Sequence, residues 1–169
     1  MKKLLVLLVV IIAAGMLFAA PEYHVEETWN GKPGGTFYYW GLGDPKTFNY
    51  DWAQETSSTD PLGFTLATLI EADEGGMPTL PGLANNWWFS DDGLTFFVQI
   101  REGIQWSDGA PFTIDDVYWT FVDVSFIPEN TANGNGSYLD SNDQLPVVEI
   151  VDDTTISFTW TVPQVTALR

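Results

Sequence analysis

The sequence predicts an α/β fold in which short strands alternate with few helices. Three features of its 169 residues indicate this. Apolar residues occupy every second position from Leu94 to Ile100, a period typical of a half-buried strand. Glycines flank an aromatic and β-branched run at 34–41, which favours a short buried strand. Thr113 stands before two acidic residues, as the N-cap of a helix does.

Two hairpins are expected. The turn Ser90-Asp91-Asp92-Gly93 separates the 87–89 and 94–101 segments, and Asp-Gly tolerates the positive φ angles of a tight turn. A second hairpin should join 147–151 to 156–160 through Asp152-Asp153-Thr154.

The helix that follows Thr113 should end before Pro128. Its apolar face comprises Ile114, Val117, Phe121 and Val124. The spacing of the leucines predicts a shorter helix over Pro61–Ile70. The Gly- and Pro-containing stretch Glu71–Pro81 and the polar stretch Asn130–Gln144 predict loops, the second of them exposed.

Composition excludes several classes of protein. Six Lys and Arg against 23 Asp and Glu give a net charge of −17, which would repel a phosphate backbone and excludes nucleic-acid binding. Zero Cys and one His exclude disulfides, Cys-ligated zinc and multi-histidine metal sites. The chain has 8 Trp, 6 Tyr and 11 Phe, and only 17% charged residues where about 25% is typical. Its binding surface is therefore expected to use rings and amides.

The N-terminus predicts export. Lys2 and Lys3 precede an apolar run from Leu4 to Ala14, and small residues close the segment, so residues 1–20 are interpreted as a signal peptide and 21–33 as a polar lead. An uncleaved anchor stays open as the alternative, because a cut after Ala20 would place Phe18 and Pro21 at unfavourable positions. Either way the expected location is periplasmic or extracellular.

Catalysis is not expected. The pairs Asp91/Asp92, Asp115/Asp116 and Asp152/Asp153 each lie in a turn or at a helix start, where an acid has a local role, rather than across a sugar-binding cavity. Asp140-Ser141-Asn142-Asp143 lacks the spacing and the glycine of an EF-hand calcium loop. No enzyme activity, metal or cofactor is therefore predicted.

Four motifs, in order, carry a family resemblance. They are Leu83-Ala84-Asn85-Asn86-Trp87, Ser90-Asp91-Asp92-Gly93, Arg101-Glu102-Gly103-Ile104-Gln105-Trp106-Ser107-Asp108-Gly109 and Thr113-Ile114-Asp115-Asp116-Val117. Together they resemble the signature of the family 5 extracellular solute-binding proteins, the peptide- and nickel-type receptors of ABC importers. The likeness runs from about Gly34 to Pro163.

The resemblance implies the N-terminal part of lobe I of a two-lobed periplasmic-binding-protein (type II) fold, with a mixed sheet, two β-hairpins and short helices. Residues 34–169 would form a partial solute-binding lobe with the second lobe absent, because full members of the family are longer. The implied function is solute binding for an ABC permease in the inner membrane, with an oligopeptide as the first solute and an oligosaccharide as the second. A truncated chain should bind weakly alone and expose aromatic surface. A secreted carbohydrate-binding or carbohydrate-active domain and a non-functional remnant stay open as alternatives.

The signature motifs themselves are interpreted as scaffold: Trp106 would pack under its loop, Arg101 would bridge a nearby acid, and Thr113 would cap the helix. In such receptors the solute contacts tend to come from the end of the opening strand and the loop after it. The candidate ligand-binding residues are Tyr39, Trp40, Gly41, Asn49, Tyr50 and Trp52. For Tyr39 and Trp40 a place in the core is an equal alternative.

Overall fold

The computed structural model describes residues 34–41 and 43–164. The chain divides into two units, Met1–Gly35 and Thr36–Arg169, and every helix and strand discussed below belongs to the second. The predicted signal peptide and polar lead, which contain the single histidine of the sequence, lie outside the described residues. Within the described part no helix is long and apolar enough to cross a bilayer.

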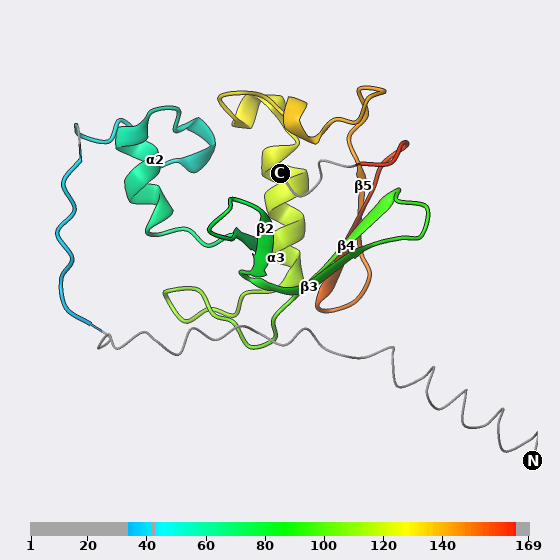
Figure 1. Ribbon diagram of the computed structural model, residues 1–169, viewed down its shortest axis with the longest axis horizontal. Helices are drawn as coiled ribbons and strands as arrows, with labels where there is room; N and C mark the ends of the chain where they lie inside the picture. Colours follow the sequence, from blue (N-terminus) through cyan, green and yellow to red (C-terminus); the bar gives the residue numbers. More distant parts are fainter. Residues whose placement is uncertain (1–33, 42, 165–169) are drawn as a thin grey trace, which may run out of the picture. The chain divides into compact units, whose positions relative to one another are not determined.

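The larger sheet of the second unit has four antiparallel strands (Figure 1). Its order is β3-β4-β6-β5. The strands are β3 (Ala84–Phe89), β4 (Thr95–Ile100), β5 (Val147–Ile150) and β6 (Thr155–Thr159). Both predicted hairpins are confirmed: β3 pairs with β4 and β5 pairs with β6, and the β4–β6 pairing joins them.

The β3–β4 turn has the chemistry that the sequence predicts. Gly93 adopts φ +70°, a conformation that favours glycine. Asp92 accepts hydrogen bonds from the Ser90 hydroxyl at 2.6 Å and from the Leu94 amide at 3.0 Å. The pKa of the Asp92 carboxyl is lowered, first by the Ser90 hydroxyl, which stabilises the charged form. This acid therefore has a local structural role.

Helix α3 (Ile114–Trp119) covers one face of the sheet, with contacts to β5 and β6 (Figure 1). The Asp116 carboxylate accepts from the Thr113 amide at 2.7 Å and from its hydroxyl at 3.2 Å, so the predicted cap is present. A π-helical segment, Thr120–Ser125, continues α3. It ends before Pro128, as expected, and Pro128 opens a short 3₁₀ turn, Pro128–Asn130.

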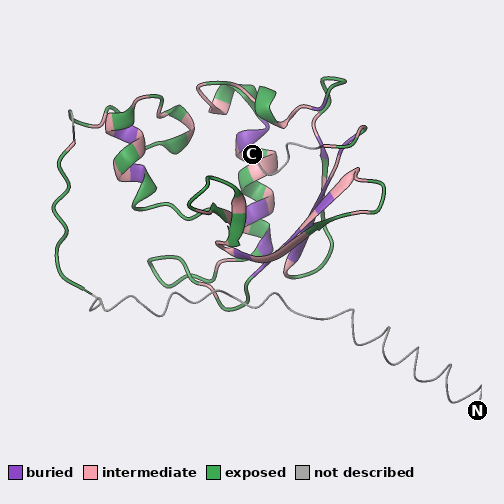
Figure 2. Cartoon of the chain, viewed as in Figure 1, coloured by how far each residue is buried: buried purple, intermediate pink, exposed green. Residues whose placement is uncertain are grey.

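The core lies between α3 and the sheet and is apolar (Figure 2). Ile156 and Val98 are its most completely buried large residues, with 0% and 1% of their surface exposed, and they face each other across the β4–β6 pairing. Phe96, Ile100, Ile114 and Val117 complete the faces that the sequence assigned to the core.

Residues 71–81, expected to form a loop, contain most of a third hairpin. Strand β1 (Ile70–Ala72) pairs antiparallel with β2 (Pro78–Pro81). Two prolines are tolerated because the two strands form a sheet of their own, in which each has an unpaired edge. Only the segment between them turns, where Asp73 accepts from the Gly75 and Met77 amides, each at 2.9 Å.

The helix expected over Pro61–Ile70 begins and ends earlier, as α2 (Thr56–Gly63). Its buried residues are Ser58 and Leu62. Leu66, which the leucine spacing placed on the buried face, is 49% exposed. After Gly63 the Thr65 and Leu66 amides both bond to the Leu62 carbonyl and close the last turn, and Ile70 belongs to β1.

The aromatic run at 34–41 does not form the predicted buried strand. Its described residues have no strand partner, and Tyr38 and Trp40 are 90% and 84% exposed. A strand needs a neighbour to satisfy its backbone groups, and local sequence does not supply one. The expected aromatic surface is thus present, and the core alternative for Trp40 is wrong.

The stretch 130–144 is only in part the exposed loop that its composition suggested, since residues 141–144 are exposed but several residues before them are half-buried. Asp140 is buried and accepts bonds from the Asn142 and Gln144 amides and from the Thr161 amide and hydroxyl. The Trp160 indole donates to the Tyr138 carbonyl at 3.1 Å. Asp140 therefore organises a packed loop and joins it to the segment after β6.

The predicted α/β class, with hairpins and short helices, is confirmed. Every strand pair that the structure describes is antiparallel, where a mixed sheet was expected.

Candidate functional site

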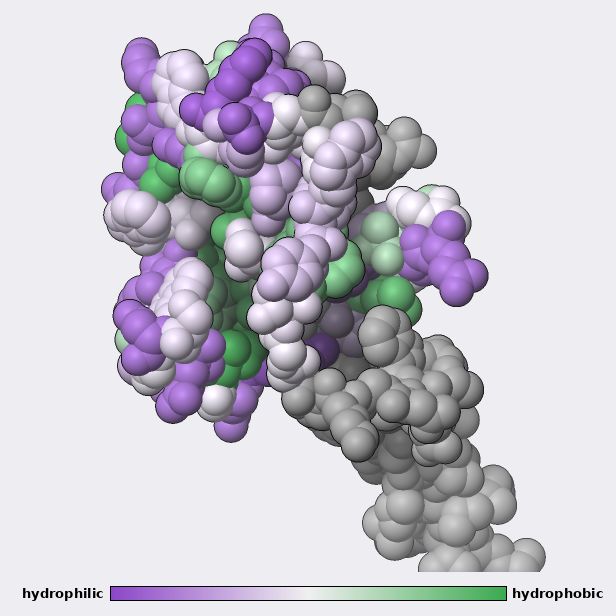
Figure 3. All heavy atoms as spheres, turned by 90° about the vertical axis from the view of Figure 1, so that its left-hand side faces the viewer, coloured by the Kyte–Doolittle hydropathy of each residue, from purple (hydrophilic) through white to green (hydrophobic). Residues whose placement is uncertain are grey.

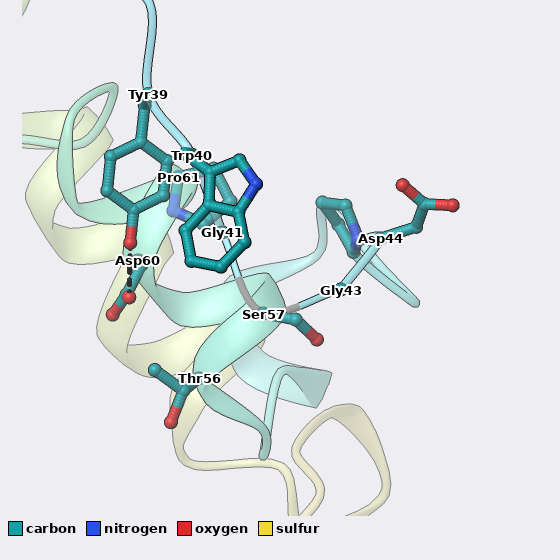
Figure 4. Close-up of a pocket in the computed structure, with 10 residues that line it drawn as sticks. Tyr39, Trp40, Gly41, Gly43, Asp44, Thr56, Ser57, Asp60 and Pro61 are labelled. Carbon is teal, nitrogen blue, oxygen red and sulfur yellow. Dashed lines mark hydrogen bonds between the residues drawn. The ribbon is translucent and has the colours of Figure 1, made fainter.

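A pocket of about 620 Å³ lies between the 39–45 segment and α2 (Figure 4). The residues that line it are Tyr39, Trp40, Gly41, Gly43, Asp44, Pro45, Thr56, Ser57, Asp60 and Pro61. Three of the six predicted ligand-binding residues, Tyr39, Trp40 and Gly41, are among them.

Hydrogen bonds to one buried serine hold the two walls together. The hydroxyl oxygen of buried Ser58 accepts from the Lys46 amide at 2.9 Å and from the Thr47 amide at 3.3 Å, and its proton goes to Glu55 Oε1 at 2.5 Å. The pKa of the Glu55 carboxyl is lowered, chiefly by this Ser58 hydrogen bond and less by the nearby Lys46 charge. Ser58 thus ties the chain after Pro45 to the first turn of α2.

A second link lies on the pocket wall itself. Tyr39 Oη donates to Asp60 Oδ2 at 2.6 Å (Figure 4), and the Tyr39 ring packs edge-on against Phe64 with centroids 5.3 Å apart. The hydrogen bond raises the pKa of the Tyr39 phenol, because deprotonation would lose the bond and place two negative charges side by side. Tyr39, which is 46% exposed, is a wall residue rather than a core residue.

The Trp40 ring stands beside Tyr39 over the pocket (Figure 4). The carboxylates of Asp44 and Asp60 are the only charged groups among the lining residues, and Thr56 and Ser57 add hydroxyls. The site therefore offers ring surface, hydroxyls and negative charge. Figure 3 views the side of the chain shown at the left of Figure 1, and it shows hydrophilic and nearly neutral residues around fewer hydrophobic ones.

The other three predicted residues lie outside this pocket. Tyr50 and Trp52 belong to a 3₁₀ turn, η1 (Tyr50–Trp52), and are 62% and 50% exposed. Asn49 caps this turn, since its side-chain oxygen accepts from the Asp51 amide at 3.1 Å. The Asp51 carbonyl in turn accepts from the Ala132 amide at 2.8 Å. The residues of η1 therefore form a separate exposed aromatic surface beside the 130–135 stretch.

The structure also places the motif residues that were interpreted as scaffold. The Arg101 guanidinium donates to the Pro81 carbonyl at 3.2 Å. Trp106 is 49% exposed and packs edge-on against Phe112, with centroids 5.3 Å apart. Asp152 accepts from the Thr154 amide and hydroxyl, a local role like that of Asp92. None of these residues lines the pocket.

Sequence reasoning missed the α2 wall, formed by Thr56, Ser57, Asp60 and Pro61. Because the helix was expected to begin at Pro61, the other three residues fell before it and were not considered as part of a wall. The usable signal was the run Thr56-Ser57-Ser58-Thr59-Asp60, since Ser, Thr and Asp are common in the first turn of a helix.

The family model and the similar proteins described below point to the same protein family. The model of the bacterial extracellular solute-binding proteins, family 5 (middle region), matches residues 79–169. The oligopeptide-binding protein AmiA of Streptococcus pneumoniae is 30% identical over 174 residues, which cover 92% of this chain and 25% of that protein. The periplasmic alpha-galactoside-binding protein of Rhizobium meliloti is 39% identical over 89 residues, or 48% of this chain and 13% of that protein.

Among solved structures, the chain resembles the ABC transporter substrate binding protein CtaP of Listeria monocytogenes. The TM-score is 0.61 and the identity 34%, over 70% of this chain and 23% of that one. The matched parts thus cover between about an eighth and a quarter of the length of these three proteins. The match to the family model extends over more than half of the chain and contains all four signature motifs, from Leu83 to Val117. The chain belongs to the bacterial extracellular solute-binding proteins, family 5.

Proposed function

We propose that the chain forms one side of the solute-binding site in the binding protein of an ABC importer. In this proposal the pocket between Tyr39 and Pro61 contacts the solute. The observation that carries this proposal is the relation to an oligopeptide-binding protein over 92% of the chain, together with an open pocket of mixed aromatic and polar lining. An oligopeptide is the proposed solute.

The lining suits a peptide. Carboxylates and hydroxyl oxygens accept hydrogen bonds from backbone amides, and the Thr56 and Ser57 hydroxyls donate to carbonyls. The rings of Tyr39 and Trp40 offer apolar surface to side chains of varied size. The hydrogen-bonding contacts use backbone groups that every peptide carries.

The proposal includes export by the 1–20 segment, work outside the cytoplasm, delivery of the solute to a membrane permease, and no catalysis. Contacts from one side leave much of a solute in water, so affinity of this chain alone should be weak, about millimolar. In the complete receptor a second lobe would cover the solute and exclude water from these contacts.

An oligosaccharide is the second candidate solute. It is favoured by the alpha-galactoside-binding relative, which is 39% identical over its shorter match, and exposed Trp and Tyr rings offer flat faces on which sugar rings can stack.

Fluorescence titration with tetra-alanine and with raffinose separates the two solutes. The matched variants are Trp40→Leu, in the pocket, and Trp119→Leu, at a 58% exposed tryptophan of α3 outside it. We expect a saturable response to tetra-alanine that Trp40→Leu removes and Trp119→Leu preserves. Saturation by raffinose alone would favour the sugar, and no saturation by either would contradict solute binding at this pocket.

A further inference from the structure

The charge and the rings of the pocket point to a narrower class of solute. Two carboxylates line it, and no Lys, Arg or His is among its ten lining residues. A site of this kind attracts a positive group and repels a carboxylate.

Asp60 is the acid best placed to bind such a group. Its Oδ2 accepts from Tyr39 Oη at 2.6 Å, which fixes the orientation of the carboxylate on the pocket wall and leaves Oδ1 as a second acceptor. The Asp44 carboxylate points away from the Trp40 ring, whereas Asp60 lies on the Tyr39 side of it (Figure 4).

The Trp40 ring supplies the second half of the recognition. Its side chain is 84% exposed, so its face is accessible to a ligand. The face of an indole ring attracts an ammonium or guanidinium group, and a nearby carboxylate adds to the attraction. Ring and carboxylate belong to one pocket and come from separate segments, which Ser58 and the Tyr39–Asp60 bond hold together.

We infer that the pocket selects solutes that carry a cationic group, an ammonium or a guanidinium, bound by the Asp60 carboxylate and the face of Trp40. The inference rests on the proposed function and deepens it from peptides in general to peptides with a basic side chain.

The test uses the full chain and two probes with the same blocked backbone, Nα-acetyl-lysine amide and Nα-acetyl-norleucine amide, which differ by the terminal ammonium group of the lysine side chain. Binding is followed at the indole NH cross-peak of Trp40 in an ¹H–¹⁵N spectrum, identified by its loss in Trp40→Leu. At low salt the lysine probe should bind about fivefold more tightly than the norleucine probe. The preference should shrink as salt is added, because salt screens exposed charges.

Asp60→Asn tests the assignment. It keeps an acceptor for Tyr39 and removes the charge, so it should abolish the lysine preference with little effect on the norleucine probe. Asp91→Asn is the matched control, an exposed acid in the β3–β4 turn with the same change of charge. An unchanged melting temperature in both variants shows that the fold is retained.

The outcomes separate the inference from the proposed function. Equal binding of both probes, or a loss of preference in Asp91→Asn as large as in Asp60→Asn, overturns the inference and leaves peptide binding standing if tetra-alanine still saturates. If neither probe nor tetra-alanine shifts the Trp40 signal, both the inference and the proposed function are wrong.

Discussion

Replacing Ile156 by Ala should destabilise the chain strongly. Ile156 is fully buried in β6, and its strand neighbours Val98 on β4 and Ile150 on β5 flank it. The change removes three carbons at about 0.8 kcal/mol each, and the unfilled cavity adds to this, so we expect a loss of about 3 kcal/mol. With a urea slope of about 2 kcal/mol per molar, the unfolding midpoint should fall by about 1.5 M.

Urea unfolding followed by far-UV circular dichroism measures this change. Val147→Ala is the control, an apolar truncation on the neighbouring strand β5 at a residue that is 63% exposed, and it should cost less than about 0.5 kcal/mol. If the two variants shift the midpoint equally, β6 is not the buried centre of the sheet and the packing described above is wrong.

Three further outcomes are expected. Gly82→Ala should destabilise the chain more than Gly93→Ala in the same assay. A Cβ at Gly82 would collide with the Thr68 carbonyl oxygen and lie 2.9 Å from the Leu69 carbonyl oxygen, whereas at Gly93 the positive φ costs about 1 kcal/mol. Equal losses of stability would contradict the close approach at Gly82. The pKa of Asp140 is lowered, first by the Thr161 hydroxyl and further by backbone amides, so its contribution to stability is present above the unfolded-state pKa and is lost as pH falls from about 4 through the folded pKa. The Asp140→Asn variant should therefore be less stable than the parent at pH 7 and should lose less stability on acidification. A variant whose stability depends on pH as that of the parent does would contradict this role. The pKa of Tyr39 is raised by its bond to Asp60, so in a spectrophotometric titration Tyr39→Phe should remove a tyrosine that ionises above the ordinary range, and loss of an ordinary one would exclude the bond.

The sequence predicted the elements whose determinants are local. Asp92-Gly93 sets the β3–β4 turn, and Thr113 with Asp116 sets the start of α3, so short windows contain the needed information. Period-two patterning then placed Phe96, Val98 and Ile100 on one face of β4, and all three are buried.

The misplaced elements depend on contacts between distant residues. The position of α2 is supported by Ser58, which accepts from backbone amides more than ten residues earlier. The 34–41 run has strand composition, yet no described residue pairs with it. The sequence around Asp140 is typical of a solvated loop, whereas in the structure the Thr161 hydroxyl donates a hydrogen bond to the Asp140 carboxylate. In each case the deciding partner lies outside the window that reveals helices and strands.

The same distinction applies to the candidate site. Tyr39, Trp40 and Gly41 were predicted from the family resemblance and the ring content, and they line the pocket. The opposite wall, with Asp60, was missed because it depends on the true start of α2 and on the Tyr39–Asp60 bond. Solute binding by Asn49, Tyr50 and Trp52 stays a prediction, since none of the three lines the pocket.

Photo-crosslinking with a benzophenone-bearing peptide, followed by mass spectrometry, tests most directly where the solute contacts the chain. Labels should concentrate between Tyr39 and Pro61 and decline when unmodified peptide competes. Labels that gather instead at the exposed Trp88 and the Phe97 stacked on it, or that ignore the competitor, would contradict the proposal that this pocket holds one side of the solute.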